Sequence, residues 1–297
     1  PPLSFDVLSL NCGAQPQIPA GPGVAVKPIA SFLSAWKQIR ANIAAAAAAP
    51  SPLAQHLTIA GAGAGGVELA FATRAALPSA TKISLVGPQL LPKEGGRVRG
   101  LVTAALAEKH IQHVPDRLVE IDPHNPNGLG LQESRAPWAS DHVLWVTDVQ
   151  AAQWLASSAL QTDKDGFVEV DEHLRSHSHP HVFAAGDVAC LTGQQRPKAG
   201  VYAVRAGPVL ARNLARAVQG LPISNSGRFK PQSNYLSLIG CGDGSAIASR
   251  GPLAWRGKWA WRLKDWIDRR FMARFNELAE MQDNTFPQSL PAAISSA

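Results

Sequence analysis

Three glycines and one aspartate are the residues of this sequence whose types and spacing point to chemistry. Gly61, Gly63 and Gly66 stand in GxGxxG spacing within GAGAGGVELA, directly after the apolar run HLTIA. Asp187 follows Gly186 at the end of another apolar run, in PHVFAAGDVA. Glycines so spaced let a backbone turn tightly and approach a phosphate, and a carboxylate at a strand end accepts hydrogen bonds from vicinal hydroxyls. Together they indicate a ligand with phosphates and hydroxyls.

The glycine loop predicts a dinucleotide site, because it lies between an expected strand and an expected helix. The helix start offers free N–H groups and the positive end of its dipole to a pyrophosphate. No acid that could bind a ribose follows the second strand, which ends at Gly87, and no arginine stands there, although Lys93 is near. The choice between NADH and NADPH therefore stays open. An ordinary glycine-rich turn is the alternative for this loop, and a turn or N-cap residue is the alternative for Asp187.

Glu68 lies two residues after Gly66, which we take as the first turn of the helix. A carboxylate there is favoured by the helix dipole, and this alone explains an acid at that position. A contact to the nicotinamide end of a bound ligand is the sharper interpretation.

The elements that must position these residues alternate between strands and helices. We expect strands in HLTIA, KISLVG and DHVLWV, a helix from the glycine loop, a helix over 97–109, and short strands in IQHV, RLVEID and LGLQE. This pattern predicts a doubly wound α/β unit over about 51–148. Before it we expect a strand in DVLSLNCG, a helix over about 29–49 and a linker at SPLAQ.

After this unit we expect strands in FVEV and HVFAAG and a helix over 199–220, with Pro208 as a kink or irregularity. A hairpin and a final helix from Trp255 to Met281 follow. The final helix carries tryptophans among arginines, at helical spacing. Packing against the body or a partner domain is the favoured role, a membrane surface is the second, and nucleic acid is the third.

Composition limits the class of protein. The net charge is +6, and the window from Arg250 to Arg274 alone holds eight basic and two acidic side chains, so the rest is near neutral. This argues against general nucleic-acid binding. Cys12, Cys190 and Cys241 form no paired motif, which fits a reducing compartment. The chain shows no signal peptide, no bilayer-spanning run and no initiator Met, and we expect a fragment of a longer protein.

The order of these stretches resembles the two-dinucleotide-fold flavoproteins, the pyridine nucleotide-disulfide oxidoreductase superfamily. DVLSLNCG is followed by the GxGxxG unit, DHVLWVTD, GFVEVDEHLRSHSHPHVFAAGDVA and AGVYAVRAGPVLARNL. AGVYAVRAGP and KDWIDRRFM most resemble the oxidoreductase module fused to selenide, water dikinase, with type II NADH dehydrogenases more distant. The resemblance covers about residues 3–276.

This resemblance implies an NAD(P)-binding domain (50–148) inserted in a partial FAD-binding domain (1–49 and 149–225), followed by a C-terminal region (226–297). It implies FAD and NAD(P)H as cofactors and an electron acceptor that the sequence does not identify. Gly186 and Asp187 would hold the ribityl or phosphate side of FAD. Gly13 and Thr147 fall at positions where the family has TG and ATG motifs and are further cofactor-binding candidates.

Lys198, Ala199 and Gly200 are the predicted flavin-lining residues. In the family, reduced flavin carries negative charge near N1 and O2, and a helix beginning here aims its positive end and an ammonium at that charge. A solvated loop lysine is the alternative for Lys198, and Lys27 is a second candidate cation.

The sequence departs from the family in three ways. It has no second GxGxxG for the FAD pyrophosphate and no CxxxxC pair, and Asp148 replaces the glycine of the ATG motif. Cys12 replaces a threonine and is expected to be a small buried side chain, not a nucleophile. We interpret the histidines of HLRSHSHPH as a solvated loop, with no metal site.

Two functions follow as hypotheses. The first is an FAD-dependent NAD(P)H oxidoreductase module that passes electrons to a quinone, a thiol or a selenium species. The second is a non-catalytic nucleotide-binding or docking module of a larger selenium-metabolism protein. A cytoplasmic location is expected, with contact at the inner membrane face as an addition.

Overall fold

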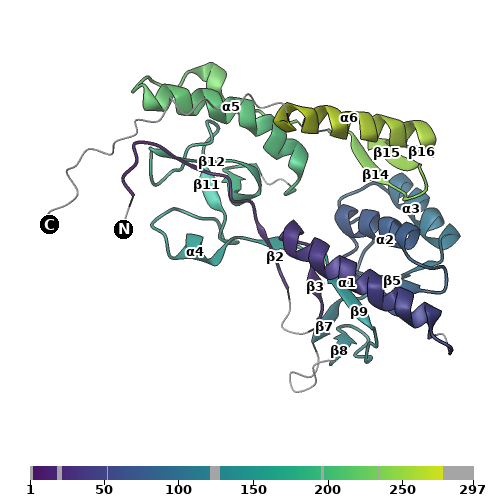
Figure 1. The fold of residues 1–297 in the computed structure, drawn as a ribbon. Helices are drawn as coiled ribbons and strands as arrows, with labels where there is room; N and C mark the ends of the chain where they lie inside the picture. The colour runs from purple at the N-terminus through teal and green to yellow at the C-terminus, as the bar shows by residue number, and fades with distance from the viewer. Residues whose placement is uncertain are drawn as a thin grey trace.

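A five-stranded parallel sheet, here called the central sheet because one unit is built around it, lies at the lower right of the computed structural model in the view of Figure 1. The structure describes residues 3–18, 22–51, 53–120, 128–194, 197–232 and 234–276. The strand order is β3-β9-β4-β5-β6, and every neighbouring pair is parallel. The strands are β3 (Val24–Ala25), β4 (His56–Ala60), β5 (Lys82–Val86), β6 (Ile111–Val114) and β9 (His142–Trp145).

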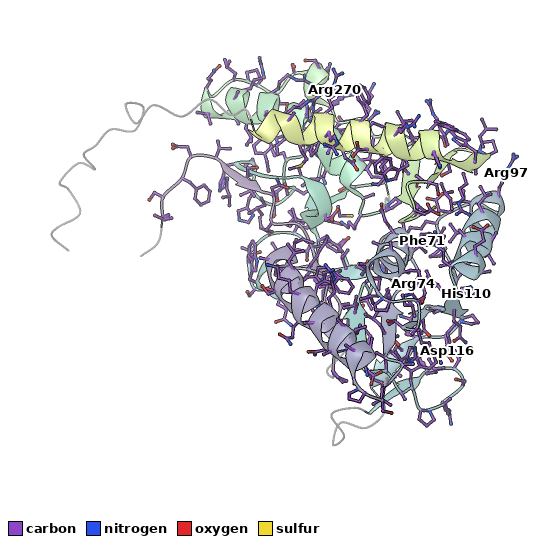
Figure 2. The ribbon with its side chains drawn as sticks, turned by 45° about the vertical axis from the view of Figure 1, so that its right-hand side comes forward. Phe71, Arg74, Arg97, His110, Asp116 and Arg270 are labelled. Atoms are coloured by element: carbon purple, nitrogen blue, oxygen red, sulfur yellow. The ribbon has the colours of Figure 1, made fainter. Side chains whose placement is uncertain are left out.

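Three helices pack on this sheet, because their apolar residues recur at helical spacing. They are α1 (Ile29–Ala48), α2 (Ala64–Ala76) and α3 (Gly96–Glu108). Buried side chains from all three, including Ile43, Phe71 and Val102, share one core with the strands. A hairpin of β7 (Leu118–Glu120) and β8 (Leu129–Leu131) packs on the sheet, where its leucines share a buried cluster with Val143 and Trp145 of β9. Asp116, which accepts hydrogen bonds from the N–H groups of Arg117 and Glu133, holds the turn between β6 and this hairpin and lies far from α6 in the view of Figure 2.

A second unit has its own core, which includes Leu155, Phe183 and Leu210. It contains two parallel strand pairs, β1 with β12 and β11 with β13, and an antiparallel pair, β2 with β10. The elements are β1 (Leu8–Leu10), β2 (Gln15–Pro16), β10 (Val149–Gln150), α4 (Gln153–Ala156), β11 (Val168–Val170), β12 (Val182–Ala184), the 3₁₀ turn Gly186–Val188, β13 (Ala189–Leu191), α5 (Gly200–Val218) and the 3₁₀ turn Asn225–Gly227.

The C-terminal region is an antiparallel meander followed by a helix. It comprises β14 (Ser237–Gly240), β15 (Ala246–Arg250), β16 (Leu253–Gly257) and α6 (Lys258–Asn276). Ile239 and Ile247 belong to the same core as Phe71 of α2. Ala248 packs with Ala260 of α6 in a separate small cluster. The meander therefore lies between the helices of the central unit and α6.

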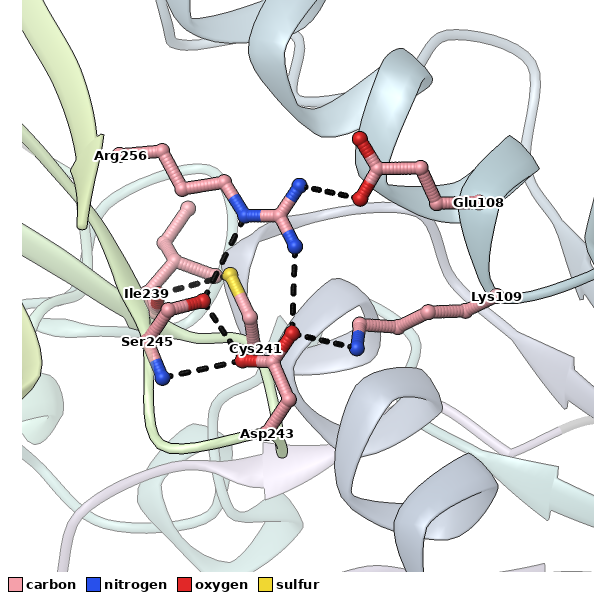
Figure 3. Close-up of polar contacts among 7 residues, drawn as sticks. All are labelled: Glu108, Lys109, Ile239, Cys241, Asp243, Ser245 and Arg256. Carbon is pink, nitrogen blue, oxygen red and sulfur yellow. Dashed lines mark hydrogen bonds and ion pairs between the residues drawn. The ribbon is translucent and has the colours of Figure 1, made fainter. Parts of the chain in front are cut away.

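A polar cluster joins the meander to α3 (Figure 3). Asp243 accepts hydrogen bonds from Lys109 Nζ at 2.6 Å and from Arg256 at 3.1 Å. Arg256 also contacts Glu108 at 2.6 Å. Burial of Asp243 opposes its ionisation, yet hydrogen bonds from Lys109 and Ser245 hold the pKa of this carboxyl well below its usual range.

The predicted α/β class is confirmed, with one element misjudged near the C-terminus. The final helix begins at Lys258, not at Trp255, because Trp255 lies in β16 and pairs with β15. Its ring stacks on Trp259 at a centroid distance of 5.2 Å, which places an aromatic pair across the strand–helix junction. The predicted helix end at Met281 lies outside the described residues. Pro208 lies within α5, which runs on through it.

Two segments pack differently from the division into domains that the sequence suggested. We assigned residues 1–49 to the FAD-binding domain, but β3 pairs with β9 of the central sheet. Ile39 and Ile43 of α1 are buried in the core of the central unit. Residues of β3 and α1, which precede the SPLAQ segment, therefore already belong to the central unit.

Candidate functional site

The three glycines of the loop between β4 and α2 have different surroundings. Gly61 has φ +119°, and a Cβ there would lie 2.2 Å from the carbonyl oxygen of Val146. A Cβ on Gly66 would lie 1.7 Å from the carbonyl oxygen of Gly61. A Cβ on Gly63 would meet no described atom within 4 Å. Packing therefore requires the first and third glycines, whereas the second leaves the backbone open to an approaching ligand.

This open glycine is the N-cap of α2. The helix begins at Ala64, and no side chain caps its N-terminus. The first N–H groups of the helix therefore keep their capacity to bind an anion, and the helix dipole favours one. An open second glycine at an uncapped helix start fits the pyrophosphate of a dinucleotide.

The structure explains why no ribose-binding acid follows β5. A Cβ on Gly87 would lie 2.5 Å from Ala62 Cβ and 2.7 Å from Ala62 N, so no side chain fits there. The loop after β5 folds back over the glycine loop, and Leu91 N donates to Ala62 O at 2.9 Å. Lys93 on this loop is exposed.

Glu68 lies in the second turn of α2, not in the first as we expected, because the helix begins at Ala64. Its Oε1 accepts a hydrogen bond from Gly240 N at 3.1 Å and lies 3.3 Å from Lys264 Nζ. The carboxylate thus links α2 to β14 and α6. A contact between Glu68 and nicotinamide stays a prediction.

A cavity of about 780 Å³ surrounds Asp187. Gly186 has φ +76°, and a Cβ there would lie 3.1 Å from Asn11 Oδ1, which explains the glycine before the aspartate. The side chains of Asp187 and Lys198 line the cavity together with Ala199 at the start of α5. The structure therefore brings together four predicted residues, and a carboxylate, an ammonium and a helix start face one space.

Lys198 is held tightly within this cavity. Its Nζ donates to Ala189 O at 2.9 Å and lies 3.6 Å from the centroid of the Phe167 ring. Burial lowers the pKa of Lys198, while Cys190 and nearby acids oppose that shift. The aromatic partner Phe167 was not predicted, because a lone phenylalanine after a turn carries no local signal.

The helix start and a second cation complete this end of the site. Gly200 is the first residue of α5, and Ala199 is its N-cap, with no capping side chain. Lys27, which follows β3, lies with its Nζ 4.0 Å from Asp187 Oδ2. A cation from the edge of the central sheet therefore reaches the carboxylate of the second unit.

The remaining predicted residues, Thr147 and Gly13, lie on connecting segments, Thr147 between β9 of the central unit and β10 of the second unit, and Gly13 between β1 and β2. Thr147 donates its hydroxyl to the carbonyl of Gln17, and Asp148 is exposed. Gly13 has φ +70° with open space around it. Residues 61–66 do not line the cavity around Asp187.

The three cysteines are free in the structure. Cys12 is exposed, so our expectation of a buried side chain was wrong, because it lies beyond the end of β1 and no described residue buries it. Burial, reinforced by Asp163, raises the pKa of the Cys190 thiol to about 11. Among the described residues, no group of three or more His, Cys, Asp or Glu side chains is placed to hold a metal ion.

The chain belongs to the pyridine nucleotide-disulphide oxidoreductase family, whose model matches residues 2–207. This family uses FAD together with a nicotinamide dinucleotide. The chain is 27% identical to ferroptosis suppressor protein 1 of Xenopus tropicalis over 207 residues, which cover 64% of this chain and 53% of that protein. It spans about half the length of the curated relatives it matches.

Solved structures show the same fold at low sequence identity. NDH2 of Plasmodium falciparum, solved with NADH, superposes with a TM-score of 0.71 at 14% identity, covering 91% of this chain and 74% of NDH2. The sulfide:quinone oxidoreductase of Aquifex aeolicus gives a TM-score of 0.69 at 14% identity, with 92% and 69% covered.

Proposed function

We propose that this chain is an FAD-dependent NAD(P)H oxidoreductase module. The observation that carries the proposal is the glycine loop, where packing demands Gly61 and Gly66 while Gly63 faces open space at an uncapped helix start. Membership of the family supplies the class of chemistry. The nicotinamide dinucleotide binds at this loop, and the flavin end of FAD binds in the cavity around Asp187.

The residues of this cavity fit the ribityl and ring end of FAD. FAD supplies the ring that takes up hydride from NAD(P)H. Asp187, with its side chain 23% exposed, is accessible to ligand hydroxyls. Lys27, Lys198 and the start of α5 lie near this carboxylate, and cations there suit an electron-rich ring, although Asp163, Asp165 and Glu169 also line the cavity.

The role of Lys198 is electrostatic in this proposal. Replacing it with glutamate should lower the midpoint potential of bound FAD, because a negative charge disfavours the reduced, more negative ring. Lys164 lines the same cavity but is 82% exposed and pairs with Asp165, so Lys164→Glu is the matched control. Equal potentials in the wild type and Lys198→Glu, by dye-coupled spectrophotometric titration, would contradict this role.

The electron acceptor lies outside the chain in this proposal. The raised pKa of the Cys190 thiol disfavours thiolate at neutral pH, which argues against an internal thiol relay there. A quinone, an external thiol and a selenium species are the acceptor classes we propose. The name of the solved sulfide:quinone oxidoreductase supports the quinone.

The competing proposal is a non-catalytic docking module of a larger selenium-metabolism protein, fused or associated with a dikinase. The ion pair between Glu68 and Lys264 favours the docking module, because the Glu68 carboxylate contacts the C-terminal region. Colour separates the two functions. The oxidoreductase in its natural protein shows visible flavin absorbance that NADH or NADPH bleaches without oxygen. A colourless protein that binds nucleotide would support the docking module.

We further propose a cytoplasmic module whose α6 contacts the inner face of a membrane. None of the helices in the described ranges has the length and hydropathy needed to cross a bilayer. Trp259 and Trp266 of α6 are 52% and 56% exposed. Arg270 of α6, labelled in Figure 2, lies over the Trp266 ring, 5.3 Å from its centroid. Exposed tryptophans among arginines suit an anionic lipid surface.

A further inference from the structure

The two tyrosines of this sequence meet in the structure. Tyr202 lies in the first turn of α5 and lines the cavity around Asp187. Tyr235 lies two residues before β14. Their ring centroids are 5.9 Å apart, with planes at 74°, an edge-to-face pair. Residues from the second unit and the C-terminal region are thus joined by aromatic contact.

The path of β14 leads Tyr235 back toward the glycine loop. Gly240 N donates to Glu68 Oε1 at 3.1 Å, and a Cβ on Gly242 would lie 2.5 Å from Phe71 O. The chain from Gly240 to Gly242 therefore runs along α2 in the same direction as the helix. Glu68 lies about 6 Å along the helix from its start at Ala64. Because these contacts move toward the end of α2 as the β14 numbers rise, the chain before Gly240 leads toward the start of α2, and Tyr235 lies on that side of Gly240.

Glu94 gives a second indication that Tyr235 lies near the glycine loop. It lies in the loop after β5, at the same sheet edge as the glycine loop, and accepts from Ser249 Oγ at 3.5 Å. Burial raises the pKa of Tyr235, and the nearby Glu94 and Tyr202 add to that shift. Tyr235 is therefore half-buried between a residue of the central sheet edge and a residue of the flavin-side cavity.

We propose that Tyr202 and Tyr235 form the aromatic wall against which the nicotinamide ring of NAD(P)H packs as it meets the flavin cavity. This inference rests on the proposed function. In this edge-to-face pair one ring can present its apolar face to a ligand while the edge of the other ring supports it.

The presence of two tyrosines in the whole sequence makes a direct test available. The chain labelled with 3-fluorotyrosine gives two ¹⁹F resonances, which Tyr202→Phe and Tyr235→Phe assign. NADH is then titrated in, with its own fluorescence as the independent measure of binding. Both resonances should shift along the same saturation curve as the fluorescence.

Three outcomes decide the inference. Matching shifts of both resonances support it. NADH binding without movement of the Tyr235 resonance overturns it and leaves the proposed function standing. Absence of NADH binding overturns the proposed function, and this inference falls with it.

A variant pair tests the same wall by affinity. Tyr235→Ala should weaken NADH binding about tenfold, because the ring surface is lost, while Tyr235→Phe should stay within about twofold. Trp154→Ala is the control for loss of an exposed aromatic ring, because Trp154 on α4 is 49% exposed and lines no part of this cavity. Equal NADH affinities for Tyr235→Ala and the wild type would overturn the inference.

Discussion

At the scale of single residues, glycines one turn apart in the same loop have separable tasks. Gly66 allows α2 to pack on the loop, whereas Gly63 keeps space open for a ligand. A side chain at Gly63 therefore fills the approach path without colliding with the protein. A side chain at Gly66 collides with backbone, which cannot move aside cheaply.

Gly63→Val should weaken NADH binding at least tenfold, which is about 1.4 kcal/mol, with a nearly unchanged melting temperature. Gly66→Ala should lower the melting temperature or prevent folding. Gly95→Val is the control, because a Cβ at Gly95, the N-cap of α3, also meets no described atom within 4 Å. NADH fluorescence titration and thermal unfolding measure both effects. A Gly63→Val protein with wild-type affinity would contradict this account of the loop.

Two histidines at the start of the central sheet should make stability depend on pH. His56 contacts Ala139 O at 2.8 Å and Ser84 Oγ at 2.9 Å. Burial lowers the pKa of both His56 and His142 from the ordinary value of 6.5. Below pH 6.5 these histidines bind protons more readily in the unfolded chain than in the folded one. Their contribution to the free energy of unfolding is therefore largest above pH 6.5 and decreases as the pH falls.

The free energy of unfolding should therefore decrease between about pH 7.5 and about pH 5.5, and His56→Gln should flatten part of this slope. Urea unfolding at several pH values measures it. A slope that is the same in His56→Gln and the wild type would show that His56 contributes nothing.

At the scale of elements, polar contacts as well as a shared core fix the meander on the central unit. Asp243→Ala would leave Lys109 and Arg256 without their shared carboxylate (Figure 3). We expect a loss of roughly 1–3 kcal/mol in unfolding free energy. Arg269→Ala is the control, because Arg269 is 79% exposed and pairs within α6. Equal losses in the two variants, by urea unfolding, would contradict the role of the cluster.

Local pattern predicted the elements around the glycine loop, because strand, loop and helix each carry their own periodicity and the loop its own spacing. The helix over 97–109 appears as Gly96–Glu108. Trp255 was wrongly predicted as helical, because the helical spacing of the tryptophans extends back into β16. Only the pairing of β16 with β15 shows where the strand ends and the helix begins.

A motif marked Asp187 as a candidate residue, and the structure places it in the lining of a cavity, while its binding of a cofactor stays a prediction. The partners of the candidate residues were not predicted. Phe167 beneath Lys198 and the Tyr202–Tyr235 pair come together through contacts between distant segments, and no local spacing records them. The packing of α1 on the central sheet likewise depends on β3 pairing with β9, a pairing of only two residues.

At the scale of the whole molecule, α6 presents one face inward and one outward. Ala260 is fully buried and Lys264 pairs with Glu68, so the orientation of the helix is fixed. The helix packs on the meander as expected, but through Ala260, whereas Trp259 and Trp266 of the aromatic face that we expected to pack lie on the surface.

The protein should sediment with vesicles that contain anionic lipid, and less so at high salt, because charge attraction is screened. Trp259→Ala with Trp266→Ala should reduce sedimentation severalfold. Trp154→Ala on α4 is the control. Equal sedimentation with neutral and anionic vesicles, or no sedimentation, would refute the membrane contact.

The central claim is that a dinucleotide at the Gly61–Gly66 loop reduces a flavin held beside Asp187. Anaerobic stopped-flow absorbance of the FAD-loaded protein mixed with NADH tests it directly. We predict that flavin absorbance is bleached at a rate that saturates with NADH, and that Gly63→Val needs at least about tenfold more NADH while retaining its FAD. No bleaching, or the same NADH dependence in Gly63→Val and the wild type, would contradict the claim.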